Sequence, residues 1–428
     1  MNVICYPSVL SGSVPAIPSK SDAHRKLICA ALSGRRCVLK MHGPFCDDIA
    51  ATVRCLEALG ASVEAHPDGL CVNPVQRQMH ADLDCGESGS TLRFLLPVAM
   101  TVCSDISVTG SGRLPDRPIG TLVQAMSAHG VQFSQDHLPL CAKGTLTGGV
   151  YEIEGNISSQ FLSGLLMALS FLDTDSEIRL TTSLQSSKYV DMTLDTLREF
   201  GAQIEAAVED GLLRYCIKGT QVREIPCSFP VDADWSNAAF WLTAGAIQPT
   251  GAVCVTGLDP ASIQGDREIV RILRQSGANL NMTAGSSLSE MTVSCGTLNE
   301  FDVSMEEIPD LLPILAVRAA AGNGVYHFTH AERLRLKESD RLTATADLIR
   351  ALGGKAEELP DGLTVYGGQL TGGTVDAKND HRLVMAAAIA ALRCEEPVTI
   401  LGAEAVNKSY PAFFDDYKAL GGRVDSVG

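Results

Sequence analysis

The chain has 428 residues, of which 45% are hydrophobic and 20% are charged. This is the balance of an ordinary globular protein, and the chain is too long for one core, so we expect two domains. The net charge of −16 argues against a nucleic-acid-binding protein, because such proteins usually present a basic face. Any anion-binding site must therefore be local.

The cysteines and the apolar segments indicate neither export nor a membrane. The 14 cysteines are scattered, with no Cys-x-x-Cys pair, and we interpret them as buried thiols of a cytoplasmic protein. The start of the chain, MNVICYPSVL, has no basic segment followed by an apolar one. No apolar run approaches the roughly 18 residues of a membrane span. We expect no membrane association and no nucleic-acid partner.

Taken in chain order, six amphipathic segments recur at nearly regular spacing. Each has apolar residues three and four apart and ends on a glycine suited to a left-handed cap, which predicts a helix with one solvated face. The segments cover residues 47–60, 117–130, 190–201, 267–277, 339–354 and 411–422, and their closing glycines are Gly60, Gly130, Gly201, Gly277, Gly353 and Gly421.

A more apolar segment precedes each amphipathic one, and a strand-like run joins the two. The apolar segments, predicted to be buried helices, cover residues 21–34, 89–100, 159–171, 234–247, 308–322 and 380–394. The strand-like runs cover residues 37–43, 104–110, 176–182, 251–257, 324–330 and 396–402. Six such repeats fit two pseudo-symmetric α/β domains with three repeats each. A scaffold or binding solenoid is the alternative that periodicity alone leaves open.

Unusual polar residues gather at the starts of the buried helices and in the loops before the outer helices. At the helix starts stand Ser19, Lys20, Ser21, Arg25, Glu87, Ser88, Gly89, Ser90, Ser158, Ser159, Gln160, Asp234, Ser236, Asp310, Asp380, His381 and Arg382. In the loops stand Arg113, Arg117, Ser186, Lys188, Arg335, Lys337, Glu338, Arg341 and Lys408.

Helix capping explains only part of the first group. We interpret Asp234, Ser236 and Asp380 as caps. Lys20, Arg25 and Arg382 oppose the helix macrodipole, and a bound anion would reconcile them with their positions.

Three further features of these groups have more than one interpretation. The loop that holds Arg113 and Arg117 is either a solvated turn or a site for carboxylate or phosphate. The segment ERLRLKESDRL is either a surface charge run or a site. Asp310 lies in an apolar stretch, where it either caps the helix or has a raised pKa suited to proton transfer.

Nine segments in order resemble the 5-enolpyruvylshikimate-3-phosphate (EPSP) synthase family along essentially the whole chain. They are IPSKSDAHR, GESGSTLRF, RLPDRPIG, SSQFLSGLL, SSKYVDMTL, IPDLLPILA, LKESDRL, NDHR and NKSYPAFF. The resemblance implies the enolpyruvyl transferase fold, an inside-out α/β barrel with three βαβαββ units in each of two domains. Domain I would comprise residues 1–18 and 229–428, and domain II residues 19–228. The two would close on their substrates in a cleft lined by Lys and Arg from both halves.

The reaction that the resemblance implies is transfer of the carboxyvinyl group of phosphoenolpyruvate to the 5-hydroxyl of shikimate 3-phosphate. Phosphate is released, the product belongs to the shikimate pathway of aromatic amino acid biosynthesis, and glyphosate is an expected inhibitor. The resemblance implies no metal and no organic cofactor. We expect a monomer in the cytoplasm.

The resemblance also assigns roles to residues at the matching motif positions. Shikimate 3-phosphate would be bound by Lys20, Ser21, Arg25, Ser158, Ser159, Gln160, Ser186, Asp310 and Lys337. Phosphoenolpyruvate would be bound by Lys20, Gly89, Arg117, Gln160, Arg341, Arg382 and Lys408. Asp310 would be the base for the 5-hydroxyl. Glu338, or alternatively Lys20, would protonate the methylene carbon.

Three positions depart from the family pattern. Glu87 stands where the family often has Asn, so a neighbour such as Arg93 should offset its charge. Arg333 replaces another common Asn. The segment around Ser186 lacks the usual Pro, which leaves Ser186 and Ser187 as alternatives.

Two rival functions remain at this stage. One is the sister enolpyruvyl transferase acting on UDP-N-acetylglucosamine, whose usual Gly-Ala-Lys-Asn segment and loop cysteine are replaced here by PSKS and RLPDRP. The other is a non-catalytic anion-binding homologue, which would be expected to lose Asp310 or Glu338.

Overall fold

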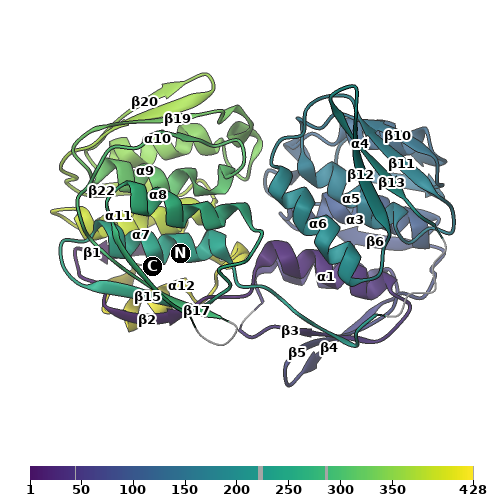
Figure 1. Ribbon diagram of the computed structural model, residues 1–428, viewed down its shortest axis with the longest axis horizontal. Coiled ribbons are helices and arrows are strands. Elements are labelled where there is room, and N and C mark those ends of the chain that lie inside the picture. The colour runs from purple at the N-terminus through teal and green to yellow at the C-terminus, as the bar shows by residue number, and fades with distance from the viewer. Residues whose placement is uncertain (44, 220–224, 285–287, 428) are drawn as a thin grey trace. The chain divides into compact units, whose positions relative to one another are not determined.

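The structure is a computed structural model that describes residues 1–43, 45–219, 225–284 and 288–427. The chain forms two compact units (Figure 1). The continuous unit is Lys20–Val231, and the discontinuous unit combines Met1–Ser19 with Asp232–Gly428. Each unit has its own hydrophobic core.

Both boundaries between the two units lie one to three residues later in the chain than predicted from the sequence. The predicted domains were divided after residue 18 and before residue 229. Strand β14 (Ser228–Pro230) instead belongs with the continuous unit, because it pairs in parallel with β3 (Cys37–Lys40). Ser19 belongs with the discontinuous unit, where its N–H donates to the carbonyl of Asp232 at 2.7 Å.

The helices and strands of the continuous unit follow one another in a repeated order. They are α1 (Lys20–Leu32), β3 (Cys37–Lys40), α2 (Asp47–Ala58), β4 (Ser62–His66), β5 (Gly69–Asn73), β6 (Ala81–Asp84), α3 (Gly89–Val102), β7 (Asp105–Thr109), η1 (Leu114–Asp116), α4 (Gly120–Ser127), β8 (Val131–Phe133), β9 (Leu140–Gly144), β10 (Val150–Ile153), α5 (Ser159–Leu169), β11 (Ser176–Leu180), α6 (Ser187–Glu199), β12 (Ile204–Glu209), β13 (Leu212–Ile217) and β14 (Ser228–Pro230).

The discontinuous unit repeats this order. Its elements are β1 (Asn2–Tyr6), β2 (Gly12–Pro15), α7 (Trp235–Ile247), β15 (Ala252–Leu258), η2 (Gly265–Glu268), α8 (Ile269–Gln275), β16 (Asn279–Ala284), β17 (Ser289–Ser294), β18 (Val303–Ser304), η3 (Pro309–Leu311), α9 (Leu312–Ala320), β19 (Val325–Thr329), η4 (Glu332–Leu336), α10 (Arg341–Ala351), β20 (Lys355–Leu359), β21 (Gly362–Tyr366), β22 (Gly373–Asp376), α11 (His381–Ala390), η5 (Ala391–Arg393), β23 (Val398–Leu401), η6 (Ala403–Lys408), α12 (Phe413–Ala419) and β24 (Arg423–Val427).

Within the described residues the strands form six four-stranded sheets, three in each unit. In every sheet one outer pair is parallel and the other two pairs are antiparallel, as in β10-β11-β13-β12. This is the pairing that a βαβαββ repeat produces, because the first crossover contains a helix and the last two strands form a hairpin. The predicted fold of two pseudo-symmetric units with three repeats each is confirmed.

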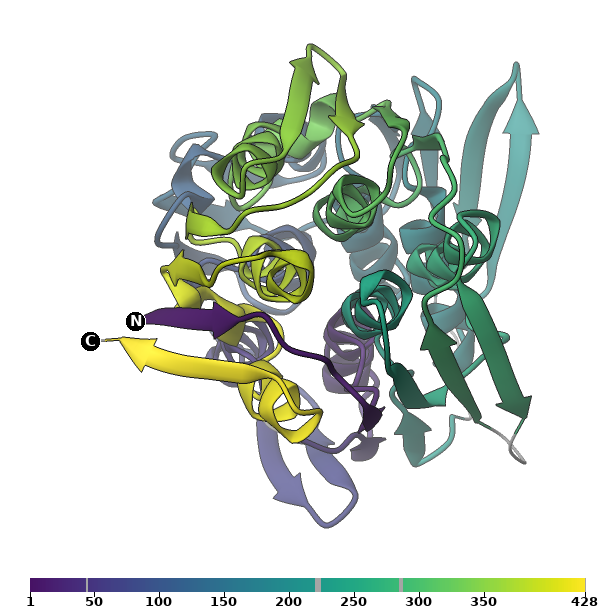
Figure 2. The same cartoon turned by 90° about the vertical axis from the view of Figure 1, so that its left-hand side faces the viewer.

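Two sheets of the discontinuous unit are completed by strands from the start of the chain. β2 pairs in parallel with β15, and β1 lies between β23 and β24. Figure 2 views the helices of this unit nearly end-on and shows β1 beside β24. Val3 thus pairs with Ile400 on one side and with Ser426 on the other.

The predicted inner and outer helices are also confirmed. The inner helices α1, α3, α5, α7, α9 and α11 are buried along most of their length. The outer helices α2, α4, α6, α8, α10 and α12 each end just before one of the six closing glycines. All six glycines have φ between 77° and 98°, the left-handed region in which glycine is favoured. The terminal glycine of each repeat therefore ends its outer helix.

In the described part of the chain, no helix is both long enough and apolar enough to cross a membrane.

Candidate active site

Asp310 is the centre of an ion-pair cluster in the discontinuous unit. It lies in η3, just before α9, and its Oδ1 accepts from Arg341 NH1 at 2.8 Å, while its Oδ2 accepts from Arg382 NH2 at 2.8 Å. Lys337 Nζ lies 3.5 Å from Oδ1. The side chain of Asp310 is 17% exposed, and that of Arg341 is 1% exposed. The structure thus brings together one carboxylate and three predicted site cations.

The charge of these cations sets the protonation state of Asp310. Burial opposes ionisation of the carboxyl group, but the charges of Arg382, Lys337 and Arg341 outweigh it and hold the pKa of Asp310 well below its ordinary value. Asp310 is therefore a carboxylate at neutral pH. The sequence offered a helix cap or a raised pKa. The raised pKa is wrong, because the ion pairs of Asp310 lower its pKa instead, and the helix cap stays a prediction.

Arg341 connects Asp310 to two further carboxylates. Its NH2 lies 2.5 Å from Glu338 Oε2, and its Nε donates to Asp380 Oδ2 at 2.9 Å. Asp380 is completely buried, and its other oxygen accepts from the N–H of Arg382, so it also caps α11 as predicted. Burial lowers the pKa of Arg341, but Asp380, Glu338 and Asp310 together raise it above its ordinary value. The Arg341 guanidinium therefore stays charged and forms ion pairs with three carboxylates.

Lys408 reaches the same part of the discontinuous unit. It ends η6, is 7% exposed, and its Nζ donates to the carbonyl of Asn379 at 2.6 Å. Asn379 directly precedes Asp380, so the Lys408 side chain lies at the start of α11. The fold thus places Lys408 near the cap that holds Arg341.

In the continuous unit, Lys20 begins α1 and pairs with a carboxylate of α2. Lys20 Nζ donates to Asp48 Oδ2 at 2.7 Å, and the two side chains are 15% and 12% exposed. The sequence explained the cations at helix starts by a bound anion. In the structure a carboxylate of the chain takes that place for Lys20, as Asp310 does for Arg382.

Arg25 lies one turn further along α1 and is engaged by the protein itself. Its Nε donates to Thr193 Oγ1 at 2.8 Å, its NH1 to the carbonyl of Ser21 at 2.6 Å and its NH2 to the carbonyl of Tyr189 at 2.8 Å. The side chain is 2% exposed, and burial lowers its pKa to about 10, which leaves it charged at neutral pH. Arg25 thus ties the start of α1 to α6.

The first turn of α3 meets two other predicted site residues. A methyl group built on Gly89 would lie 2.6 Å from Arg117 NH1, so the Gly89 backbone and the Arg117 guanidinium are in close contact. Arg117 follows η1 and is 7% exposed. Gln160 on α5 accepts from Arg93 NH1 at 2.8 Å and donates to Ser90 Oγ at 2.9 Å. Three predicted binding residues, Gly89, Arg117 and Gln160, therefore lie close to the start of α3.

The serines of the continuous unit lie at the starts of two helices. Ser158 caps α5, where its Oγ accepts from the N–H of Gln160, and Ser159 is the first residue of that helix. Ser186 precedes α6 with φ of 55°, a conformation that costs energy for a residue other than glycine, and it is buried. Ser187, the alternative assignment, is the first residue of α6 and is partly exposed.

Several charged residues of the sequence prediction have structural partners instead. Arg335 lies beside Glu358 and Asp340, with its NH1 2.6 Å from Glu358 Oε1. Lys188 forms an exposed pair with Asp191 at 3.2 Å. These contacts favour the surface interpretation for the segment that holds Arg335.

The unusual residues at the departures from the family pattern contact neighbouring loops. Arg333 NH2 donates to the carbonyl of Glu306 at 3.3 Å. The Glu87 carboxylate packs against Gly112, in the loop that leads to Arg117. Arg93, suggested as the residue that offsets Glu87, donates to Gln160.

One predicted helix cap is wrong, and a neighbouring buried carboxyl group was not predicted from the sequence. Asp234 caps α7 as predicted. Ser236 was expected to cap as well, but its hydroxyl instead donates to Asp266, which is 3% exposed. Burial, and secondly the nearby charge of Asp310, raise the pKa of Asp266 to about 7. Asp266 lies in the segment QGD, where neither the repeat pattern nor a group of charged residues indicated a functional carboxyl group.

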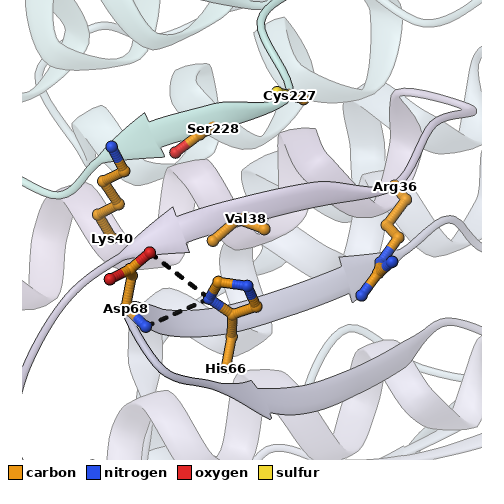
Figure 3. A pocket seen from close by; sticks show the side chains of 7 residues that line it. All are labelled: Arg36, Val38, Lys40, His66, Asp68, Cys227 and Ser228. Atoms are coloured by element: carbon orange, nitrogen blue, oxygen red, sulfur yellow. Dashed lines mark hydrogen bonds and ion pairs between the residues drawn. The ribbon is translucent and has the colours of Figure 1, made fainter.

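A separate hollow of about 350 Å³ lies in the continuous unit, away from these residues. Figure 3 shows Lys40 of β3 and Arg36 just before that strand, His66 and Asp68 near the β4–β5 turn, and Cys227 and Ser228 at the start of β14. His66 is already engaged, since its Nδ1 lies 3.9 Å from the Asp68 carboxylate. No predicted site residue lines this hollow. Among the described residues, no three of the types His, Cys, Asp and Glu are grouped so that they could hold a metal ion.

Comparison with known proteins identifies the family to which these residues belong. A family model described as EPSP synthase (3-phosphoshikimate 1-carboxyvinyltransferase) matches residues 5–417. The chain belongs to the EPSP synthase family. A 3-phosphoshikimate 1-carboxyvinyltransferase from Clostridium perfringens is 40% identical over 426 residues, which cover 98% of each chain. One from Clostridioides difficile is 37% identical over 436 residues, covering 98% of this chain and 97% of the relative.

Solved structures agree on the fold. An EPSP synthase from Acinetobacter baumannii matches 99% of this chain and 100% of its own, with a TM-score of 0.78 and 23% identity. The enolpyruvyl transferase NikO from Streptomyces tendae matches 99% of this chain and 98% of its own, with a TM-score of 0.78 and 18% identity. Membership of the EPSP synthase family also removes the scaffold or solenoid interpretation of the repeats.

Proposed function

We propose that this member of the EPSP synthase family transfers the carboxyvinyl group of phosphoenolpyruvate to the 5-hydroxyl of shikimate 3-phosphate and releases phosphate. Family membership over almost the whole chain supports the reaction. The observation that carries the proposal within the molecule is the cluster of Arg341, Arg382 and Lys337 around Asp310. It combines cations for anionic substrates with a carboxylate that can accept a proton.

The proposed binding residues come from both units. For phosphoenolpyruvate they are Lys20, Gly89, Arg117, Gln160, Arg341, Arg382 and Lys408. For shikimate 3-phosphate they are Lys20, Ser21, Arg25, Ser158, Ser159, Gln160, Ser186, Asp310 and Lys337. A guanidinium suits both because its fork of N–H donors matches the oxygens of a carboxylate or phosphate. At Gly89 the missing side chain leaves room beside Arg117.

The chemistry needs one base and one acid. When the 5-hydroxyl oxygen bonds to C2 of phosphoenolpyruvate, the hydroxyl proton must leave and C3 must gain a proton. Loss of phosphate and of one C3 proton then restores the double bond. We assign the base to Asp310 and the acid to Glu338, with Lys20 as the alternative acid.

The ion pairs of Asp310 suggest how substrate would activate it. Its low pKa in the free protein makes it a weak base. Anionic substrate oxygens that pair with Arg341, Arg382 and Lys337 would draw these cations partly away from Asp310, and its proton affinity would rise. Binding and basicity would thus be coupled in the same cluster.

The test is phosphate release from phosphoenolpyruvate with and without shikimate 3-phosphate. We expect release that depends on this acceptor and is not supported by UDP-N-acetylglucosamine. Release without any acceptor, or none in its presence, would contradict the proposal and would favour a non-catalytic homologue. We further propose a cytoplasmic location, which the scattered cysteines of the sequence support. We also propose a monomer, for which sedimentation should give a mass close to 45.4 kDa.

A further inference from the structure

Three helices of the continuous unit are joined by a chain of buried hydrogen bonds. His24 Nδ1 on α1 lies 2.7 Å from Thr52 Oγ1 on α2, and Thr52 Oγ1 lies 2.7 Å from Thr91 Oγ1 on α3. Thr91 Oγ1 then donates to Ser88 Oγ at 2.8 Å. All four side chains are at most 1% exposed. A buried polar side chain is stabilising only when its partners are present, so each member depends on the next.

The end of this chain caps the helix that carries Gly89. Ser88 Oγ accepts from the N–H of Thr91 at 3.2 Å, which fixes the first turn of α3. That turn contains Gly89, which contacts Arg117, and Ser90, which contacts Gln160. A displacement of Ser88 would therefore move Gly89 relative to Arg117.

The other end of the chain lies on the helix that carries Lys20. His24 follows Lys20 by one turn on α1, and Thr52 follows Asp48 by one turn on α2. The Lys20–Asp48 ion pair and the His24–Thr52 hydrogen bond are thus two successive links between the same two helices. The Thr91 hydroxyl also lies 3.3 Å from the carbonyl of Asp48, which is an alternative acceptor for its one proton at the same junction of helices.

The imidazole takes part in these contacts as a neutral group. Burial, and secondly the charges of Lys20 and Arg25, hold the pKa of His24 well below its ordinary value. The geometry of the chain is therefore insensitive to pH near neutrality.

We propose that the hydrogen-bonded chain His24–Thr52–Thr91–Ser88 positions the residues that bind phosphoenolpyruvate. It does so by fixing the position of Gly89 on α3 relative to Lys20 on α1. The inference rests on the proposed function, because that function assigns Gly89, Lys20 and Arg117 to this substrate. None of the four residues needs to touch a substrate, so they are positioning residues.

The test compares Thr52→Val with Thr52→Ser. Valine has the shape of threonine without the hydroxyl, so it interrupts the chain in the middle, whereas serine retains the hydroxyl. We expect Thr52→Val to raise the KM for phosphoenolpyruvate by about 5-fold or more and to change the KM for shikimate 3-phosphate by less than about 2-fold. Thr52→Ser should restore both constants to within about 2-fold of the wild type.

Thr243→Val is a matched control for the substitution itself. Thr243 on α7 is also completely buried, but its hydroxyl has no hydrogen-bond partner among the described residues, so removing it should change neither KM. Thermal unfolding of each variant, measured alongside the kinetics, gives the fraction of folded enzyme.

The possible outcomes separate this inference from the proposed function. Acceptor-dependent phosphate release by the wild type supports the function independently of any variant. With an active wild type, equal KM values for Thr52→Val and Thr52→Ser would overturn the inference. Equal increases in the KM of both substrates, or a loss of kcat that follows only the folded fraction, would overturn it as well. An inactive wild type would remove the function and the inference together.

Discussion

Replacing Gly89 by alanine tests the contact between α3 and Arg117. The new methyl carbon would lie 2.6 Å from Arg117 NH1, 2.9 Å from Cζ and 3.0 Å from NH2. An ordinary contact begins at 3.4 Å, so the guanidinium must retreat by about 0.8 Å. Because the three nearest atoms all belong to the end of a flexible side chain, which can move, the fold should tolerate the change. The displacement should instead weaken the proposed contact with phosphoenolpyruvate.

The expected cost is that of one weakened charged hydrogen bond. Such bonds contribute about 1.5–3 kcal/mol, which corresponds to an increase of about 10–150-fold in the KM for phosphoenolpyruvate. The assay is phosphate release at saturating shikimate 3-phosphate, with thermal unfolding to show that the variant is folded. Gly368→Ala is the matched control, because nothing lies within 4 Å of a methyl group there. An unchanged KM in a folded Gly89→Ala variant would refute the assignment of Gly89 and Arg117 to this substrate.

Three further predictions concern the carboxyl groups of the discontinuous unit. Asp310→Asn should lower kcat by about 10²–10⁴-fold with smaller changes in either KM, because it removes the proposed base, and normal turnover would exclude Asp310 from that role. Asp380→Ala should destabilise the protein by about 3–5 kcal/mol in urea unfolding, because it leaves the buried charge of Arg341 without that partner, and a loss under 1 kcal/mol would show that Glu338 and Asp310 suffice. Asp266 has a raised pKa of about 7 in the folded protein, so the folded state binds the extra proton and wild-type stability should fall as pH rises from about 4 through 7. Asp266→Asn should therefore gain stability relative to the wild type between pH 5 and pH 8 on the order of 1 kcal/mol or more, and a difference independent of pH would contradict the shift.

Local signals were sufficient to predict the repeats. Apolar periodicity and a closing glycine are encoded within about 15 residues, so each outer helix and its end could be read directly. The boundary between the units was missed by a few residues because β14 has three residues and no alternating pattern. Nor does any local signal indicate that β1 pairs with β23, since the partners are almost the whole chain apart.

For the candidate site, the sequence indicated which charged residues are unusual, but it did not predict the residues that they contact. The conflict with the helix macrodipole singled out Lys20 and Arg382, and the structure pairs each of them with a carboxylate. Their carboxylate partners could not be inferred, because Asp48 and Asp310 lie 28 and 72 residues away along the chain. Asp310 was misjudged for the same reason, since its pKa depends on cations contributed by later repeats. Thr52 and Thr91 gave no signal, because a buried threonine on a helix has the same pattern as valine.

The position of β1 in the middle of its sheet has a consequence for biosynthesis. Val3 is synthesised well before its partners Ile400 and Ser426, which lie about 400 residues further along the chain. At about 5–20 residues per second, synthesis of the intervening chain takes on the order of 20–80 s. The continuous unit contains all the strands of its own sheets and can fold during that interval. β1 must meanwhile remain without these partners, so the nascent chain exposes a strand with two open edges until β23 and β24 have been synthesised.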